Sequence, residues 1–214
     1  MTQEVMTAAT DAGHGEEAHH YDPVGAKVGM WLFLFTEVLL FGTLFIVYAV
    51  YLTTYRYEFR IVSEHLDKLI GAANTIVLLT SSLTMVLSIA ALERERKNQS
   101  LGFMTATVLL SVVFLGFKAM EWGDKFAHDL YPKSETMLLK PFGEQVFYGL
   151  YFTMTGLHAV HVVIGAGAIL LAMFLVWKGK TNKDRMAFLD NTGLYWHLVD
   201  VIWIFLFPLF YLIG

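Results

Sequence analysis

Residues 144–177, EQVFYGLYFTMTGLHAVHVVIGAGAILLAMFLVW, form an apolar run that can cross a lipid bilayer as a single helix. A spanning helix needs about 20 mostly apolar residues, so a run of this length can also tilt. Four further runs qualify, and they extend from about Lys27 to Tyr51, Gly71 to Leu92, Leu101 to Glu121 and Phe188 to Leu212. Because the runs are continuous rather than alternating, a transmembrane β-barrel does not fit. The sequence predicts an all-α integral membrane bundle of five transmembrane helices.

The composition agrees with a membrane protein. Hydrophobic residues make up 56% of the chain, charged residues only 16%, and the mean hydropathy is +0.54. The absence of cysteine from the sequence excludes disulfides and thiolate metal sites. The formal net charge of −4 speaks against a nucleic-acid partner. Residues 1–26 are polar and contain no apolar signal-peptide core, so we expect a mobile tail in front of a membrane domain at 27–214.

Basic residues in the connections predict how the chain is oriented in the membrane. The segment ERERKNQS (93–100) carries three of them and KGKTNKDR (178–185) carries four, both over short stretches. Short loops rich in Lys and Arg face the cytoplasm. The N-terminus is therefore expected to be cytoplasmic and the C-terminus to lie outside.

Five ionisable side chains are expected near the middle of the membrane, where each is costly unless it is paired or neutralised. They are Glu37, His158, His161, His197 and Asp200. Glu37 lies about 15 Å along its helix from Lys27, at a depth similar to that of His197. A buried cluster of Glu37 with one or more of the histidines is therefore geometrically possible. His197 and Asp200 are three positions apart and share a helix face.

A sixth charged residue, Glu121, is expected at the end of the third membrane helix. It follows Lys118 by three positions, a spacing that allows an ion pair on one face of a helix. Trp122 comes next, and tryptophan is common at membrane interfaces. This segment is interpreted as an interfacial charge pair.

His158 and His161, in TGLHAVHVVIG (155–165), allow several interpretations. At three positions apart they point the same way, so they cannot be the opposite axial ligands of one haem, although one of them with His197 could be. The two histidines could also form a metal site together with Glu37 or Asp200. A role in moving protons is a further interpretation. The plainest interpretation is polar packing, in which each ring hydrogen-bonds to neighbouring helices. Small residues on the same helix favour such packing, among them Gly149, Gly156, Gly165 and Gly167.

Several strings of the chain resemble subunit III of the haem-copper respiratory oxidases, which include the cytochrome c oxidases and related quinol oxidases. GMWLFLFTEVLLFG (29–42) resembles the first shared helix of that family with its buried glutamate, here Glu37. The resemblance extends from about Val28 to the C-terminus. The other similar strings are NTIVLLTSS (74–82), KAMEW (118–122), TGLHAVHVVIG (155–165) and YWHLVDVIWIFLFPLFYL (195–212).

This resemblance implies a non-catalytic subunit of a bacterial plasma-membrane oxidase that binds no haem or copper itself, because those metals belong to subunits I and II. Its implied partners are subunits I and II, membrane lipids with a bound phospholipid, and a larger respiratory supercomplex. Its implied function is to stabilise the complex and to support proton uptake during oxygen reduction coupled to proton pumping. The matching positions are expected to act in internal pairing, lipid or subunit contact, or proton buffering, and they are Glu37, Glu121, His158, His161, His197 and Asp200.

The chain departs from the seven-helix members of this family, whose first two helices have no counterpart in it, and so it resembles the short five-helix bacterial type. Three alternatives stay open at this point. The first is an accessory subunit of a related complex such as a nitric oxide reductase. The second is a haem-carrying electron-transfer anchor, and the third is a proton-coupled transporter.

Overall fold

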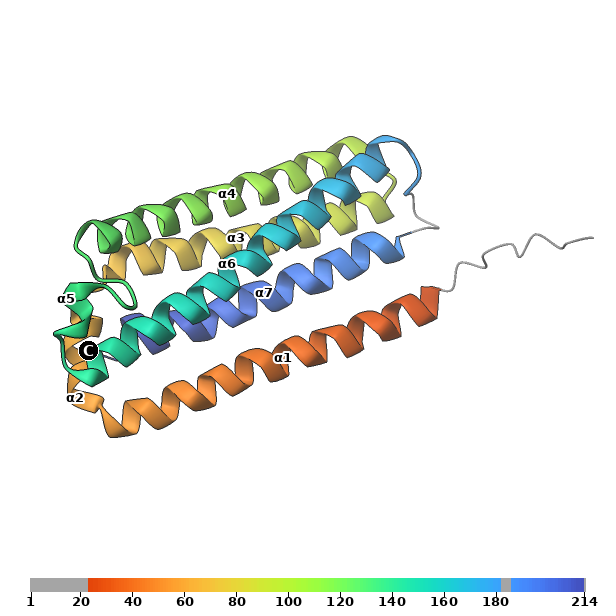
Figure 1. Cartoon of the computed structure of the whole chain (residues 1–214). Helices are drawn as coiled ribbons and strands as arrows, with labels where there is room; N and C mark the ends of the chain where they lie inside the picture. The colour runs from red at the N-terminus through yellow and green to blue at the C-terminus, as the bar shows by residue number, and fades with distance from the viewer. Residues whose placement is uncertain (1–22, 182–185, 214) are drawn as a thin grey trace, which may run out of the picture.

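The computed structural model describes residues 23–181 and 186–213, and every regular element in these residues is an α-helix. Five long helices lie side by side (Figure 1). Their bounds are α1 Pro23–Thr54, α3 Lys68–Glu93, α4 Lys97–Ala127, α6 Phe142–Trp177 and α7 Ala187–Tyr211. Each is long and apolar enough to span a membrane. The chain is thus an all-α membrane bundle of five helices, as the sequence predicts.

The observed helices extend beyond the predicted spans at most ends. The largest difference is in α4, which begins at Lys97 and continues to Ala127 rather than ending at Glu121. Hydropathy marks the apolar part of a helix, whereas hydrogen bonding continues into polar residues. At the start of α3, the Asp67 side chain accepts hydrogen bonds from the amides of Leu69 and Ile70 at 2.9 and 3.1 Å. This N-cap explains why α3 begins at Lys68.

The predicted N-terminal tail lies mostly outside the described residues. Only its last four positions, 23–26, are described, and they form the first turn of α1. Proline lacks the amide hydrogen that a first-turn residue would leave unpaired, which makes Pro23 a favourable first residue of a helix.

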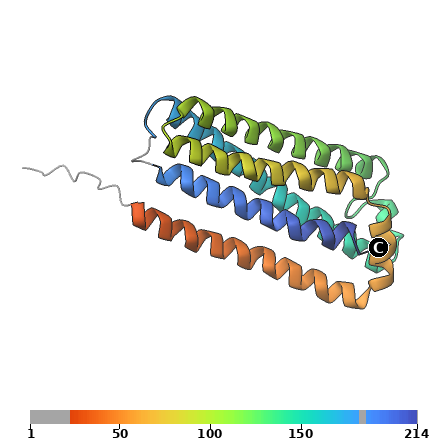
Figure 2. The ribbon, with the colours of Figure 1, turned by 180° about the vertical axis from the view of Figure 1, so that it is seen from behind.

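Two short helices, α2 (Arg56–Glu64) and α5 (Glu135–Leu138), lie at the end of the bundle that also holds the C-terminus, as Figures 1 and 2 both show. Neither was expected from the hydropathy of the sequence, because both are short and partly polar. α2 buries Phe59 and Val62. It lies so close to α6 that a Cβ at Gly143 would be 2.9 Å from the Cβ atoms of Tyr55 and Glu58.

Helix α1 is the outlying helix of the bundle. It contacts α7, α6 and α2, whereas α3, α4, α6 and α7 pack against one another along much of their length (Figure 2). Only 11% of the residues in the apolar centre of α1 are buried, compared with 50% in α7. The core therefore lies among α3, α4, α6 and α7. It is rich in large rings, among them Trp196, Trp203, Tyr151 and Phe114.

Close helix contact depends on only some of the small residues. A Cβ at Gly165 of α6 would be 2.8 Å from the ring of Trp196, and one at Gly71 of α3 would be 2.8 Å from the ring of Phe207. At Gly149 and Gly167 a Cβ would meet nothing within 4 Å. The expectation of close packing is thus right for Gly165 and wrong for those two, because composition does not tell which side of a helix faces a neighbour.

Candidate functional site

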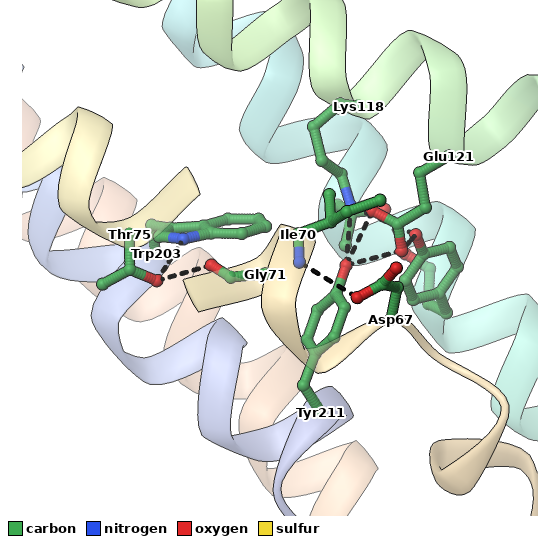
Figure 3. Close-up of polar contacts among 10 residues, drawn as sticks. Asp67, Ile70, Gly71, Thr75, Lys118, Glu121, Trp203 and Tyr211 are labelled. Atoms are coloured by element: carbon green, nitrogen blue, oxygen red, sulfur yellow. Dashed lines mark hydrogen bonds and ion pairs between the residues drawn. The ribbon is translucent and has the colours of Figure 1, made fainter. Parts of the chain in front are cut away.

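A buried charge cluster joins α4, α6 and α7 near the end of the bundle that carries α2 and α5. Lys118 and Glu121 lie on one face of α4, with Lys118 Nζ 2.9 Å from Glu121 Oε2. Tyr151 of α6 and Tyr211 of α7 each donate a hydroxyl hydrogen to Glu121 Oε1, at 2.7 and 2.6 Å. Figure 3 shows Lys118, Glu121 and Tyr211 turned toward one another from two helices. Glu121 therefore accepts hydrogen bonds from three helices.

The Lys118 ammonium group in this cluster also has several polar and aromatic partners. Lys118 Nζ donates to the hydroxyl oxygens of Tyr151 and Tyr211 at 3.1 and 3.0 Å. It also lies 5.2 Å from the centre of the Trp203 ring, within the range of a cation–π contact. Both members of the pair are buried, Lys118 with 2% exposure and Glu121 with 7%. Charges this deep are tolerated only when paired and hydrogen-bonded, and each condition is met here.

The predicted ion pair between Lys118 and Glu121 is therefore confirmed, but its predicted place at the end of the helix is wrong. Because α4 continues to Ala127, the pair lies inside the helix rather than at its end. Trp122 contacts the ring of Phe152 on α6. A lysine inside a hydrophobic run is itself a signal of a buried partner.

A second polar contact joins α1 to α6. Glu37 Oε2 lies 2.9 Å from His161 Nε2, and the exposure of the two side chains is 13% and 10%. The other ring nitrogen of His161, Nδ1, lies 2.7 Å from the carbonyl oxygen of Leu157. A carbonyl only accepts, so Nδ1 is the donor in that bond, which leaves Nε2 to face the Glu37 carboxyl. The Glu37–His161 contact thus ties α1 to α6 through two polar side chains.

The expected contact between Glu37 and the histidines is confirmed for His161 only. His197 instead makes a hydrogen bond through Nδ1 to Ser82 Oγ of α3, at 2.6 Å. Depth alone suggested His197 as a partner of Glu37, but the contacts of His197 are made on the side of α7 that meets α3. The depth of a residue gives its position along the membrane normal. It does not say toward which neighbouring helix the side chain points.

Asp200 lies one turn after His197 on α7 and is 3% exposed. It interacts with Ser82, although neither carboxylate oxygen makes a hydrogen bond of normal geometry to the described residues. His197 and Asp200 thus share the face that the sequence predicts, and they meet the same serine of α3. Two further hydrogen bonds follow this seam, from Trp196 Nε1 to Ser81 Oγ and from Trp203 Nε1 to Thr75 Oγ1, both 3.1 Å long. Figure 3 shows the bond between Trp203 and Thr75.

His158 is the most deeply buried of the predicted residues, with no exposed surface. Its ring lies edge-on to Phe114 and tilted against Trp203, with ring centres 5.6 and 5.2 Å away. Neither ring nitrogen hydrogen-bonds to any described residue. The prediction that both histidines are satisfied by hydrogen bonds is therefore right for His161 and wrong for His158. A shift of three positions turns the side chain by about 60° and moves it by about 4.5 Å, enough to give the two rings different neighbours.

The six predicted residues thus fall into four separate environments rather than one site. Within residues 23–181 and 186–213, no three His, Asp or Glu side chains are close enough to hold a metal ion together.

Known proteins are similar in sequence to nearly the whole chain. Residues 2–214 match the family model for cytochrome c oxidase subunit III. The chain belongs to this family. Its relatives include a probable quinol oxidase subunit 3 of Staphylococcus saprophyticus, 34% identical over 88% of this chain and 89% of that protein. Another is the cytochrome bo(3) ubiquinol oxidase subunit 3 of Pseudomonas aeruginosa, 31% identical over 98% of this chain and 95% of that protein.

The resemblance seen in the sequence is thereby confirmed. The protein is a subunit III of the haem-copper oxidases and a multi-pass bacterial membrane protein, whose partners are other oxidase subunits. Sequence reasoning missed three members of the charge cluster in this subunit III, Tyr151, Tyr211 and Lys125. The Lys125 ammonium lies 5.8 Å from the Tyr151 ring centre and is nearly buried. A buried tyrosine hydroxyl needs a partner, and that rule points to Tyr151 within its apolar run.

Proposed function

We propose that this chain is subunit III of a quinol-oxidising haem-copper oxidase. In this proposal the haem, the copper and the oxygen chemistry belong to the partner subunits. The observation that carries the proposal is the match over almost the full chain to relatives named as quinol oxidase subunits. The sequence resemblance covers oxidases of both cytochrome c and quinol, and the names of these relatives favour quinol.

The chain packs beside subunit I and stabilises the assembled oxidase. The exposed surface of α1 supports this role. The hydrophobic effect does not hold helices together within lipid, so a helix with few contacts is weakly held unless a partner covers it. α1 has few such contacts and exposes a long apolar face, which includes Leu32, Phe35, Leu39 and Ile46.

The subunit also supports proton uptake during oxygen reduction, and Glu37 and His161 are the residues best suited to hold a proton in this role. Their side chains lie 2.9 Å apart and keep a small exposed fraction. In this arrangement the N-terminus and the basic loops face the cytoplasm of the bacterial cell, in line with their lysines and arginines.

Purification through a tag on this chain, in a mild detergent, tests the assignment. We expect haem- and copper-bearing subunits to co-purify and to consume oxygen with a quinol as electron donor. Recovery of this chain only as a homo-oligomer would refute the oxidase assignment. Turnover with reduced cytochrome c but not with quinol would refute the choice of donor, and reduction of nitric oxide in place of oxygen would favour the nitric oxide reductase alternative.

A Glu37→Gln variant tests the proton role. We expect its complex to assemble with the wild-type haem content but to lose turnover over repeated cycles, because the pair can no longer share a proton in the same way. A Glu93→Gln variant, at the exposed end of α3, serves as a control that makes the same change from carboxyl to amide away from the pair. Equal sustained turnover in wild type and Glu37→Gln would exclude the pair from proton uptake.

A further inference from the structure

Five exposed cations gather at the end of the bundle where α1 begins. They come from the turn between α3 and α4 and from the residues after α6, and we call them the basic patch: Arg94, Arg96, Lys97, Lys178 and Lys180. The same two segments expose two carboxylates, Glu93 and Glu95, so the surface has a net charge of +3. None of the five cations forms an ion pair with a described residue. The basic patch is therefore able to bind an anionic group.

The two segments of the basic patch form one continuous surface. Lys97 Nζ donates to the carbonyl oxygen of Trp177 at 2.8 Å, which holds the start of α4 against the end of α6. A recess of about 290 Å³ opens beside this contact and is lined by residues 95–99. It includes the first residues of α4, where no described side chain caps the helix. Backbone amide hydrogens there can bind an acceptor in addition to the cations.

The N-terminal segment of the chain carries the complementary charge. Residues 1–22 contain no lysine or arginine and five acidic side chains, which are Glu4, Asp11, Glu16, Glu17 and Asp22. These residues lie outside the described structure, but α1 begins directly after them at Pro23. Both views place the start of α1 at the same end of the bundle as the turn between α3 and α4 and the end of α6 (Figures 1 and 2). The acidic segment thus adjoins the end that carries the basic patch.

The acidic segment is long enough to reach the patch. α1 contacts α7, α7 contacts α3, and α3 contacts α4. Axes of neighbouring helices are about 8–10 Å apart, so α4 lies about 25–30 Å from α1. An extended chain spans about 3.3 Å per residue, so Asp11 reaches about 40 Å from Pro23 and Glu16 about 23 Å. In the proposed orientation the nearby membrane surface is anionic and repels the segment, whereas the patch attracts it.

We propose that residues 11–17 of this chain dock on the basic patch, with Asp11, Glu16 and Glu17 against its arginines and lysines. Charge complementarity carries this inference, and the short connection to α1 raises the local concentration of the segment at the patch. Exposed ion pairs are individually weak, so the contact depends on several of them together and is sensitive to salt. An anionic headgroup or an acidic segment of a partner subunit would compete for the same cations.

Cysteine cross-linking tests the contact, because the chain has no native cysteine. The full chain, in the complex with which it purifies and in nanodiscs of phosphatidylcholine, carries Gly15→Cys in the segment and Gln99→Cys at the recess. We expect a short bis-maleimide to join them about fivefold faster than in a variant that adds Asp11→Asn, Glu16→Gln and Glu17→Gln. This neutral variant keeps the length of the segment, so the difference reports its charge. In about 1 M salt, where the Debye length is about 3 Å, the two rates should become equal.

Amine labelling gives a second measurement, without engineered cysteines. We expect a lysine-reactive reagent to modify Lys97 and Lys178 about fivefold faster when the segment is neutral. The exposed Lys68 and Lys133, at the opposite end of the bundle, are the controls and should react at an unchanged rate. Equal cross-linking of the native and neutral segments at low salt would overturn the proposal. So would equal labelling of Lys97 and Lys178 in both, which would mean that a lipid headgroup or a partner subunit covers the patch.

Discussion

Lys118 and Glu121 illustrate how a membrane protein keeps two charges in its interior. The pair is formed locally, within one turn of α4, but two tyrosines from α6 and α7 complete the hydrogen bonds of the carboxylate. The stability of each charge therefore depends on helices that are distant in the sequence. Removing one member leaves the other buried without its counter-charge, which is more costly than removing both.

A Lys118→Met variant tests this reasoning. We expect it to lower the free energy of unfolding by about 3–5 kcal/mol, because the Glu121 charge is left unpaired. The double variant Lys118→Met with Glu121→Gln should recover part of that loss, since the amide carries no charge and still accepts from the tyrosine hydroxyls. Unfolding by sodium dodecyl sulfate in mixed micelles measures both. A Lys68→Met variant at an exposed position is the control, and a double variant no more stable than Lys118→Met would contradict the argument.

The contact between Glu37 and His161 leads to a second residue-scale prediction. We expect Glu37→Ala and His161→Ala to be non-additive in the free energy of unfolding by about 0.5–3 kcal/mol, because each side chain is the direct partner of the other. Glu37→Ala combined with His197→Ala should be additive within about 0.5 kcal/mol, since His197 bonds to Ser82 instead. The reverse pattern would show that the partner of Glu37 is His197.

At the scale of the element, α6 is the helix on which most of the contacts converge. It provides Tyr151 to the charge cluster, His158 to the aromatic core, His161 to α1 and Gly165 to α7. These four positions meet different partner residues, which lie on α4, α7 and α1. Substitutions along α6 should therefore differ sharply in effect according to the side of the helix on which they lie.

Gly165 and Gly167 form a matched pair for this prediction. Alanine at 165 places its Cβ 2.8 Å from the rigid Trp196 ring, so we expect a loss of about 1–3 kcal/mol in the free energy of unfolding. Alanine at 167 meets no atom within 4 Å, and its better helix propensity should make it neutral or slightly stabilising. Detergent unfolding of the two variants checks this, and equal effects would mean that α6 is rotated relative to the arrangement described.

At the scale of the whole molecule, the bundle divides into a packed group of four helices and the outlying α1. The few polar contacts of α1 include the Glu37–His161 pair and the ion pair between Lys27 and Asp190 at 3.4 Å. Tyr48 also donates its hydroxyl hydrogen to the carbonyl of Leu209. Such contacts orient α1 but bury little of its surface. We therefore expect the bundle to open first at α1.

Cysteine labelling tests the order of opening, because the chain has no native cysteine. Phe41→Cys reports on the inner face of α1 and Phe114→Cys on the core between α4 and its neighbours, and both positions are almost fully buried. In the isolated chain we expect Phe41→Cys to react with a thiol reagent at a lower concentration of sodium dodecyl sulfate. Simultaneous labelling would show that all five helices separate together. In the assembled oxidase, protection of Phe41→Cys should increase if a partner subunit covers α1.

The sequence by itself determined the five spans, the helical class, the family and the ionisable residues of the interior. These features follow from composition and from spacing along one helix, which a linear chain shows directly. Only the tertiary structure decided that Glu37 meets His161 rather than His197 and that Glu121 is buried. It also decided that His158, among the described residues, contacts aromatic rings instead of hydrogen-bond partners. The physical reason is rotation: hydropathy specifies how deep a residue lies in the membrane, whereas the packing of neighbouring helices decides which way its side chain faces.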